Sequence, residues 1–204
     1  MSFEKNVFIN CPFDENYQSL LRPLLFTVIY FKLNPRIALE RTASSEQRLD
    51  KIFNLIAESK YGIHDLSRLK ATKKGEYYRL NMPLELGVDI GCKQFGNDLQ
   101  KNKCYLVLAS DSYQYRAAAS DLSGADIEAH SDEPEEVVGI VRKWLVNQTG
   151  QKISGSSKIW GDFLGFMSSN YDELKARGFS EKDIKSHAVS ELMTDMKLWV
   201  EANL

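Results

Sequence analysis

Short apolar segments alternate with amphipathic segments over most of the chain, and this alternation limits the possible folds more than any other feature. Strands are expected at residues 7–9, 36–39, 61–65, 104–108 and 125–128. Helices are expected at residues 17–31, 49–56, from 81 onward, and 134–146. Strand–helix alternation of this kind is typical of a parallel sheet that is covered by helices on both faces. The sequence therefore predicts an α/β fold with a central five-stranded parallel sheet.

The expected arrangement is a flavodoxin-like three-layer sandwich, with right-handed crossovers between its strands, at residues 1–148. The polar, Gly/Ser-containing stretch 147–158 is typical of a linker. After it, residues 159–204 are expected to form a helical hairpin, with Gly178 and Ser180 as caps at the turn. The hairpin has an apolar stripe that must be buried on the main domain or on another chain: Trp160, Phe163, Phe166, Met167, Leu192, Met196 and Trp199.

Charge and composition exclude several classes of protein. The chain has 26 basic and 28 acidic residues, so it has no overall field to hold a polyanion, and direct binding of nucleic acid is not expected. The longest apolar run, 20–33, is interrupted by a proline and two basic residues, so no membrane span is expected. The beginning of the chain does not resemble a signal peptide, which predicts a cytoplasmic protein. Neither a metal site nor a disulfide framework is expected, because ligand spacing is lacking and the cysteines are scattered: Cys11, Cys92 and Cys104.

Polar segments follow two strands that are expected to be neighbours. In an open parallel sheet, ligands bind beyond the carboxyl ends of the strands, where the strand order reverses. In flavodoxin-like order that point lies between the first and third strands, which lead into Asn10–Asp14 and His64–Arg68. A helix carrying Glu85 begins shortly after the second segment. These polar segments are therefore expected to converge on one cleft.

Glu85 is unusual within the helix that is expected to begin near Asn81. Apolar and small residues flank it on both sides, including Gly87, and Gly91 follows at one-turn spacing. Asp89 lies one turn beyond Glu85 on the same face. An acid in this setting is a candidate catalytic group, and the alternative is that Glu85 only caps the N-terminus of the helix.

Two short motifs carry a resemblance to known enzyme families. Leu84-Glu85-Leu86-Gly87, preceded by a strand ending in Asp65, resembles the nucleoside 2-deoxyribosyltransferases, whose Glu in this context is the nucleophile. Val7-Phe8-Ile9-Asn10 with Asp14 is similar to the first strand and loop of Toll/interleukin-receptor (TIR) domains. TIR enzymes place a catalytic Glu on a helix of the same kind of sheet and cleave NAD. The resemblance covers roughly residues 5–110 and does not extend to the hairpin.

Both families attack a ribosyl C1′–N bond through an oxocarbenium-like state, which requires a carboxylate against C1′. The resemblance assigns that role to Glu85, and Asp65 would protonate a neutral leaving base. Nicotinamide would need no general acid, because it is cationic in the substrate and becomes neutral when it leaves. The expected substrate-binding residues are Asn10 and Asn81 for ribose hydroxyls, Arg41 and Arg68 for phosphate, Phe13 or Tyr61 for a base, and Asp14 and Asp89 at the same site.

Each of these residues also has a purely structural interpretation. Asp65 could cap the next turn, His64 could be a packed strand residue, and Asn10 could bond only to neighbouring backbone. Arg68 could pair with a surface acid such as Glu76. Cys11 has no adjacent group that would activate it as a nucleophile.

The favoured interpretation is an N-glycosidase that acts on NAD or a related nucleotide, with no cofactor because NAD is the substrate. The resemblance implies an anti-phage defence effector that is activated by homo-oligomerisation or by a partner protein, through the helices of residues 159–204. Two alternatives stay open. One is 2′-deoxyribosyl transfer between bases, and the other is a non-catalytic, TIR-like domain that senses nucleotides or acts as an adaptor.

Overall fold

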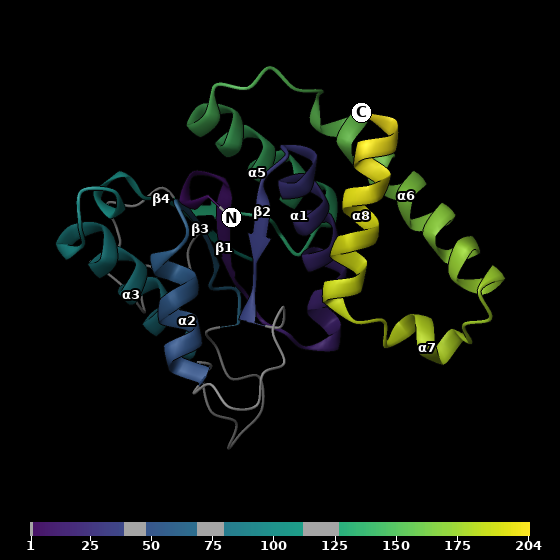
Figure 1. The fold of residues 1–204 in the computed structure, drawn as a ribbon, viewed down its shortest axis with the longest axis horizontal. Coiled ribbons are helices and arrows are strands. Elements are labelled where there is room, and N and C mark those ends of the chain that lie inside the picture. The colour runs from purple at the N-terminus through teal and green to yellow at the C-terminus, as the bar shows by residue number, and fades with distance from the viewer. Residues whose placement is uncertain (1, 39–47, 69–79, 112–126) are drawn as a thin grey trace.

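The centre of the structure is an all-parallel sheet of five strands in the order β2-β1-β3-β4-β5 (Figure 1). The computed structural model describes residues 2–38, 48–68, 80–111 and 127–204. The strands are β1 (Asn6–Asn10), β2 (Asn34–Arg36), β3 (Tyr61–Asp65), β4 (Cys104–Ala109) and β5 (Ile127–Ala129). This order is the predicted flavodoxin-like one, so the reversal of strand order lies between β1 and β3.

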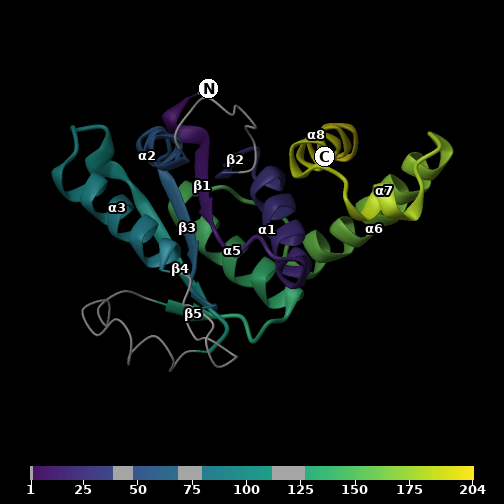
Figure 2. The ribbon, with the colours of Figure 1, turned by 90° about the horizontal axis from the view of Figure 1, so that it is seen from below.

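Helices cover both faces of the sheet. They are α1 (Gln18–Tyr30), α2 (Arg48–Ala57), α3 (Asn81–Phe95) and α5 (Pro134–Thr149), with 3₁₀ turns η1 (Phe3–Lys5), η2 (Glu15–Tyr17) and η4 (Gln100–Asn102). Figure 2 shows α1 and α5 on one side of the sheet and α2 and α3 on the other. The predicted three-layer architecture is confirmed. In the described part of the chain, no helix has the length and apolar character to cross a membrane.

Side chains along each strand alternate between the two layers, as the pleat requires. Val7 and Ile9 of β1 belong to the core beneath α1 and α5, whereas Phe8 packs with α2. In β3, Ile63 joins the first core, and His64 points to the other face, where its ring contacts Phe8. Residues of even number in β1 and β3 therefore face α2 and α3.

Strand β2 begins two residues before the predicted strand 36–39 does and ends three residues before it does. It pairs with β1 through Asn34, Pro35 and Arg36. The apolar character of residues 37–39 suggested the later position. Because β2 is an edge strand, the missing N–H of Pro35 is tolerated there. Strand β5, at Ile127–Ala129, overlaps the predicted strand 125–128 and extends one residue beyond it, and residues 125 and 126 lie outside the described residues.

The C-terminal segment forms α6 (Ser156–Ala176), α7 (Glu181–Lys185) and α8 (Val189–Asn203). The predicted second helix of the hairpin is therefore divided into α7 and α8. The predicted caps are confirmed, because Gly178 has a φ of +88° and Ser180 forms a capping box with Asp183. The predicted linker is shorter than expected: α5 continues to Thr149 and α6 begins at Ser156.

The aromatic stripe of these helices is buried on the main domain. Phe26 of α1 lies 5.6 Å from Phe163, 5.7 Å from Phe166 and 5.7 Å from Trp199, measured between ring centroids. Figure 2 shows α6 and α8 outside α1, on the side away from the sheet. The sequence left open whether the stripe is buried on the main domain or on another chain, and the structure shows the first of these.

Candidate active site

The carboxyl ends of β1 and β3 lie side by side, and the register pairs Asn10 with His64. Cys11 follows β1 directly and is buried. Burial raises the pKa of Cys11 well above its ordinary value, and the nearby charges of Asp65, Glu85 and Asp14 raise it further. Three carboxyl groups from separate segments therefore converge on this strand end, as the sequence predicted. The thiol of Cys11 is held protonated there, which makes it a poor nucleophile.

Glu85 lies on the buried face of α3 and is 7% exposed. Among the described residues, its carboxyl group forms no hydrogen bond or ion pair. Burial raises the pKa of Glu85 to about 7, and the positive charge of Arg48 lowers it only in part. A carboxyl group with this pKa exchanges its proton near neutral pH, which is typical of a group that takes part in acid–base or covalent chemistry.

Asp65 lies at the end of β3 and is fully buried. Its Oδ2 accepts hydrogen bonds from the Tyr17 hydroxyl at 2.5 Å and from His130 Nε2 at 3.0 Å. Its Oδ1 accepts a hydrogen bond from the backbone N–H of Ser67 at 2.8 Å and another from the Ser67 hydroxyl. The carboxylate is thus surrounded by donors from three segments of the chain.

These contacts keep Asp65 ionised. Burial alone would raise the pKa of Asp65, yet the hydrogen bonds from His130, Ser67 and Tyr17 lower it below its ordinary value. The backbone N–H of Asp132 donates to His130 Nδ1 at 3.1 Å, so the proton of a neutral His130 lies on Nε2 and faces Asp65. An acid that is buried and ionised in this way has no proton to give to a leaving base. The expected role of Asp65 as a general acid is therefore not supported by its geometry.

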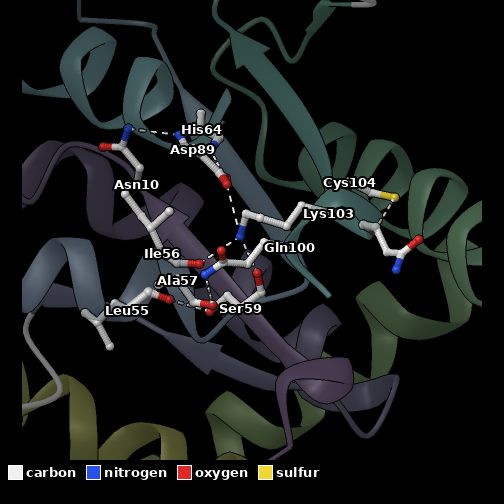
Figure 3. Close-up of polar contacts among 11 residues, drawn as sticks. Asn10, Leu55, Ile56, Ala57, Ser59, His64, Asp89, Gln100, Lys103 and Cys104 are labelled. Carbon is white, nitrogen blue, oxygen red and sulfur yellow. Dashed lines mark hydrogen bonds and ion pairs between the residues drawn. The ribbon is translucent and has the colours of Figure 1, made fainter. Parts of the chain in front are cut away.

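A second polar cluster lies on the α3 side of the sheet (Figure 3). Asn10 Nδ2 is 3.1 Å from His64 Nδ1, and His64 Nε2 is 2.9 Å from Asp89 Oδ2. Lys103 Nζ lies 3.0 Å from Asp89 Oδ1. All four side chains are almost completely buried. We refer to Lys103, Asp89, His64 and Asn10 as the buried relay.

Gly62 makes room for this relay within β3. A Cβ atom at this position would overlap the carboxylate of Asp89 and crowd His64 Nε2. Burial alone would raise the pKa of Asp89, whereas the hydrogen bond with His64 and the charge of Lys103 lower it. Asp89 was expected to bind substrate. Its carboxylate instead faces the protein interior, one turn beyond Glu85 on the same helix face.

The other predicted binding residues are distributed around this site. Phe13 is half-buried against the main core, and Asp14 caps η2 by accepting a hydrogen bond from the Tyr17 N–H at 3.1 Å. Arg68 is half-buried, and its positive charge partly offsets the rise that burial causes in the pKa of Tyr17. Asn81 is exposed at the beginning of α3. These positions surround the carboxyl ends of β1 and β3.

One predicted binding residue lies away from this site, and another is not among the described residues. Tyr61 begins β3, so it lies at the opposite end of the strand from Asp65, and its ring packs against Trp144. The expectation that Tyr61 stacks on a base is therefore wrong. Arg41, the second expected phosphate ligand, lies outside the described residues.

Sequence reasoning missed several residues of this site: Tyr17, Arg48, His64 as part of a relay, Lys103 and His130. Two signals for the relay were present. His64 interrupts an apolar strand of a sheet covered on both faces, and a buried polar residue requires a partner. Gly62, two residues earlier, is typical of a strand that is approached closely by another group.

A cavity of about 800 Å³ opens at the other end of the sheet. Its lining includes Phe3, Arg36, Glu58 and Lys197, and Arg36 forms an ion pair of 3.2 Å with Glu58. Parallel sheets bind ligands beyond the carboxyl ends of their strands, and Glu85 lies at that end. We therefore place the candidate active site around Glu85 rather than in this cavity.

Within the described ranges, no group of three or more His, Cys, Asp or Glu side chains is arranged to hold a metal ion. A comparison of the chain with protein-family models, curated proteins and solved structures finds no match. The function must therefore be inferred from the chemistry of the site.

Proposed function

We propose that this protein is an N-glycosidase that cleaves the ribosyl C1′–N bond of NAD or a related nucleotide, with Glu85 as the reacting carboxylate. The observation that carries the proposal is Glu85 itself. Its carboxyl group is buried, has no hydrogen-bond partner among the described residues and has a pKa of about 7 at the point where strand order reverses. Structural carboxylates at buried positions normally acquire donors, as Asp65 does.

The reaction follows from the charges involved. When the C1′–N bond breaks, its electron pair goes to the nitrogen, and positive charge develops on the ribose ring. Ionised Glu85 would stabilise this cation or trap it as an ester, and water then adds to C1′ with release of one proton. A pyridinium substrate also brings a positive charge to the site, and an opposite charge favours the ionised form of Glu85.

The ionisation of Asp65 favours NAD over deoxynucleosides as the substrate. Nicotinamide leaves as a neutral molecule and requires no proton, whereas a neutral purine or pyrimidine base does. Asp65 is ionised and enclosed by donors, so it cannot supply that proton. Glu85 alone would have to act as both acid and nucleophile for a neutral base.

The experiment measures nicotinamide release from NAD by the full chain and by the Glu85→Gln variant. Exposed Glu173 on α6 provides the matched control, Glu173→Gln. The proposal expects release by the wild-type chain and the control, and a loss of at least about 100-fold in Glu85→Gln. Unchanged release by Glu85→Gln would contradict the assignment of Glu85.

The same assay separates the alternative functions. Base exchange between deoxynucleosides without nicotinamide release would identify a deoxyribosyltransferase. Equal NAD binding by the wild-type chain and Glu85→Gln, with no release from either, would identify a nucleotide sensor.

We further propose that a second copy or a partner protein activates the enzyme through the outer surfaces of α6 and α8. Leu164 and Leu198 are 49% and 60% exposed on these helices, whereas the aromatic stripe itself is buried on α1. The test is to measure mass in solution and specific activity over the same range of protein concentration. A monomer with full activity at every concentration would contradict activation by self-association.

A further inference from the structure

The donors and acceptors of the buried relay permit only one direction for its hydrogen bonds. An ammonium group can only donate, and Lys103 Nζ faces the carbonyls of Ile56, at 2.7 Å, and Ser59, together with Asp89 Oδ1. Lys103 donates hydrogen bonds to the two carbonyls, and its contact with Asp89 Oδ1 is an ion pair without the geometry of a hydrogen bond. Asp89, which is ionised, can then only accept from His64.

The orientation of the Asn10 amide determines which ring nitrogen of His64 carries the proton. Asn10 Nδ2 is 2.9 Å from the backbone carbonyl of Met82, which can only accept, so the amide nitrogen must occupy this place. The second N–H of the same nitrogen points to His64 Nδ1, at 3.1 Å. His64 Nδ1 therefore accepts, and the proton of His64 lies on Nε2, directed at Asp89 Oδ2.

Among the described residues, this arrangement leaves the amide oxygen of Asn10 without a hydrogen-bond donor. Both N–H groups are used, and the amide oxygen points away from His64 in Figure 3. Asn10 Oδ1 is not among the fully buried atoms without a partner, so solvent, and therefore a ligand, can reach it. The contact with Met82 places the amide beside the first turn of α3, one turn before Glu85 on the same buried face.

We propose that Lys103, Asp89 and His64 are positioning residues that hold Asn10 as a hydrogen-bond acceptor for a ribosyl hydroxyl next to Glu85. The inference rests on the proposed function. There, the hydroxyl is the 2′-hydroxyl, because C2′ is bonded to the C1′ atom that Glu85 meets. Asn10 determines specificity, since a ligand without this hydroxyl leaves a dry, unpaired acceptor.

The relay supplies what Asn10 cannot supply alone. An isolated amide can rotate by 180° and present either its oxygen or its nitrogen to a ligand. In the relay, rotation would place the amide oxygen against both the Met82 carbonyl and the bare Nδ1 of His64. The buried charges of Asp89 and Lys103 stabilise the one tautomer of His64 that keeps Asn10 in this orientation.

The first test is independent of any substrate. Nitrogen-15 NMR of the full chain at pH 7 reports which ring nitrogen of His64 carries the proton. The proposal expects a protonated Nε2 and an unprotonated Nδ1. A proton on Nδ1 would overturn it, because Asn10 would then present its oxygen to His64 and its nitrogen to the ligand.

The second test measures ligand binding in the Glu85→Gln background, where turnover is prevented. The probes are NAD and the NAD analogue that lacks the 2′-hydroxyl of the nicotinamide ribose. With Asn10 intact, NAD is expected to bind about 3- to 10-fold more tightly than the analogue. Adding His64→Leu should bring this ratio close to one. His64→Gln should preserve most of it, because its amide still offers one donor and one acceptor.

The outcomes distinguish the inference from the proposed function. Absence of nicotinamide release by the wild-type chain contradicts the function, while the tautomer and the binding ratio still test the relay. An equal affinity for both probes, or no binding of either, overturns the role of Asn10. If His64→Leu fails to fold, Asn10→Leu replaces it, with the same loss of discrimination expected.

Discussion

Glu85 and Asp89 lie one turn apart on the same buried face of α3, yet their carboxyl groups have opposite pKa shifts. Burial raises the pKa of Glu85 to about 7, whereas His64 and Lys103 offset the effect of burial at Asp89 and lower its pKa. The difference arises from partners and not from depth. Asp89 is held by the relay, and Glu85 is left without a hydrogen-bond donor among the described residues. Carboxyl groups whose pKa values are shifted apart commonly have separate roles. This agrees with the proposal that Asp89 supports Asn10 and Glu85 reacts.

Glu85→Gln should change how stability depends on pH. Because the folded pKa of about 7 lies above the ordinary 4.5, the native chain binds more protons between these values. The free energy of unfolding therefore falls as pH rises through this window. Glu85→Gln removes that fall, and we expect it to be about 1–3 kcal/mol more stable than wild type at pH 8. Urea denaturation at pH 5 and pH 8 measures this, and equal pH dependence in both proteins would contradict the burial of an unpaired Glu85.

Asp65→Asn should destabilise the chain by about 3 kcal/mol at pH 7. Tyr17, Ser67 and His130 all donate hydrogen bonds to Asp65. An Asn at this position would direct an N–H donor at some of these donors, so those contacts would be lost. Because the folded pKa of Asp65 is lowered, its contribution is present above pH 4 and is lost as pH falls through the folded-state pKa. Urea denaturation checks the loss. The control Asp98→Asn, whose side chain is 99% exposed, should change stability by less than about 0.5 kcal/mol.

Lys103→Met should cost about 3–5 kcal/mol, because it leaves the buried carboxylate of Asp89 without its cation. The double variant Lys103→Met/Asp89→Asn should be less destabilised than the sum of the two single variants. A coupling free energy above about 1 kcal/mol, measured by denaturation of all four proteins, supports a true ion pair. Additive losses would mean that the two residues stabilise the fold independently.

Phe26→Ala should cost about 3–5 kcal/mol, since this ring is fully buried between α1 and the C-terminal helices. A chain that ends at Gln148 loses the aromatic partners of Phe26 and is expected to aggregate or unfold. Circular dichroism and thermal unfolding measure both effects. Leu164→Ala, at a half-exposed position on α6, serves as the control and should cost less than about 1 kcal/mol. A truncated chain that unfolds cooperatively would show that the α/β part is independent of the hairpin.

The sheet order and the position of Glu85 could be predicted from the sequence because both depend on local patterns. Apolar runs such as residues 104–108 identify strands, and the switch point follows from their order. The division between α7 and α8 was missed because the apolar spacing continues through it. In the structure, α7 ends at Lys185 and α8 begins at Val189. Between them, the ring nitrogens of His187 lie 3.4 Å from Glu191 Oε2 and 3.3 Å from Asp195 Oδ2.

The buried relay could not be assembled from the sequence because it joins distant positions. Lys103 and His64 are brought together only by the pairing of β3 with β4 and by the packing of α3 on both. The environment of Asp65 could not be predicted either, since its donors Tyr17 and His130 lie 48 and 65 residues away in the sequence. Contacts of this kind form only in the tertiary structure, so the local sequence pattern of each segment does not reveal them.

The pH dependence of nicotinamide release from NAD tests the central claim most directly. If ionised Glu85 is the reacting group, kcat/KM should rise about tenfold per pH unit below pH 7 and level off above it, following the pKa of about 7. Glu85→Gln should show only a residual rate without this rise. A wild-type rate that is independent of pH between 5 and 8, or that falls with rising pH, would contradict an ionised Glu85 as the catalytic carboxylate.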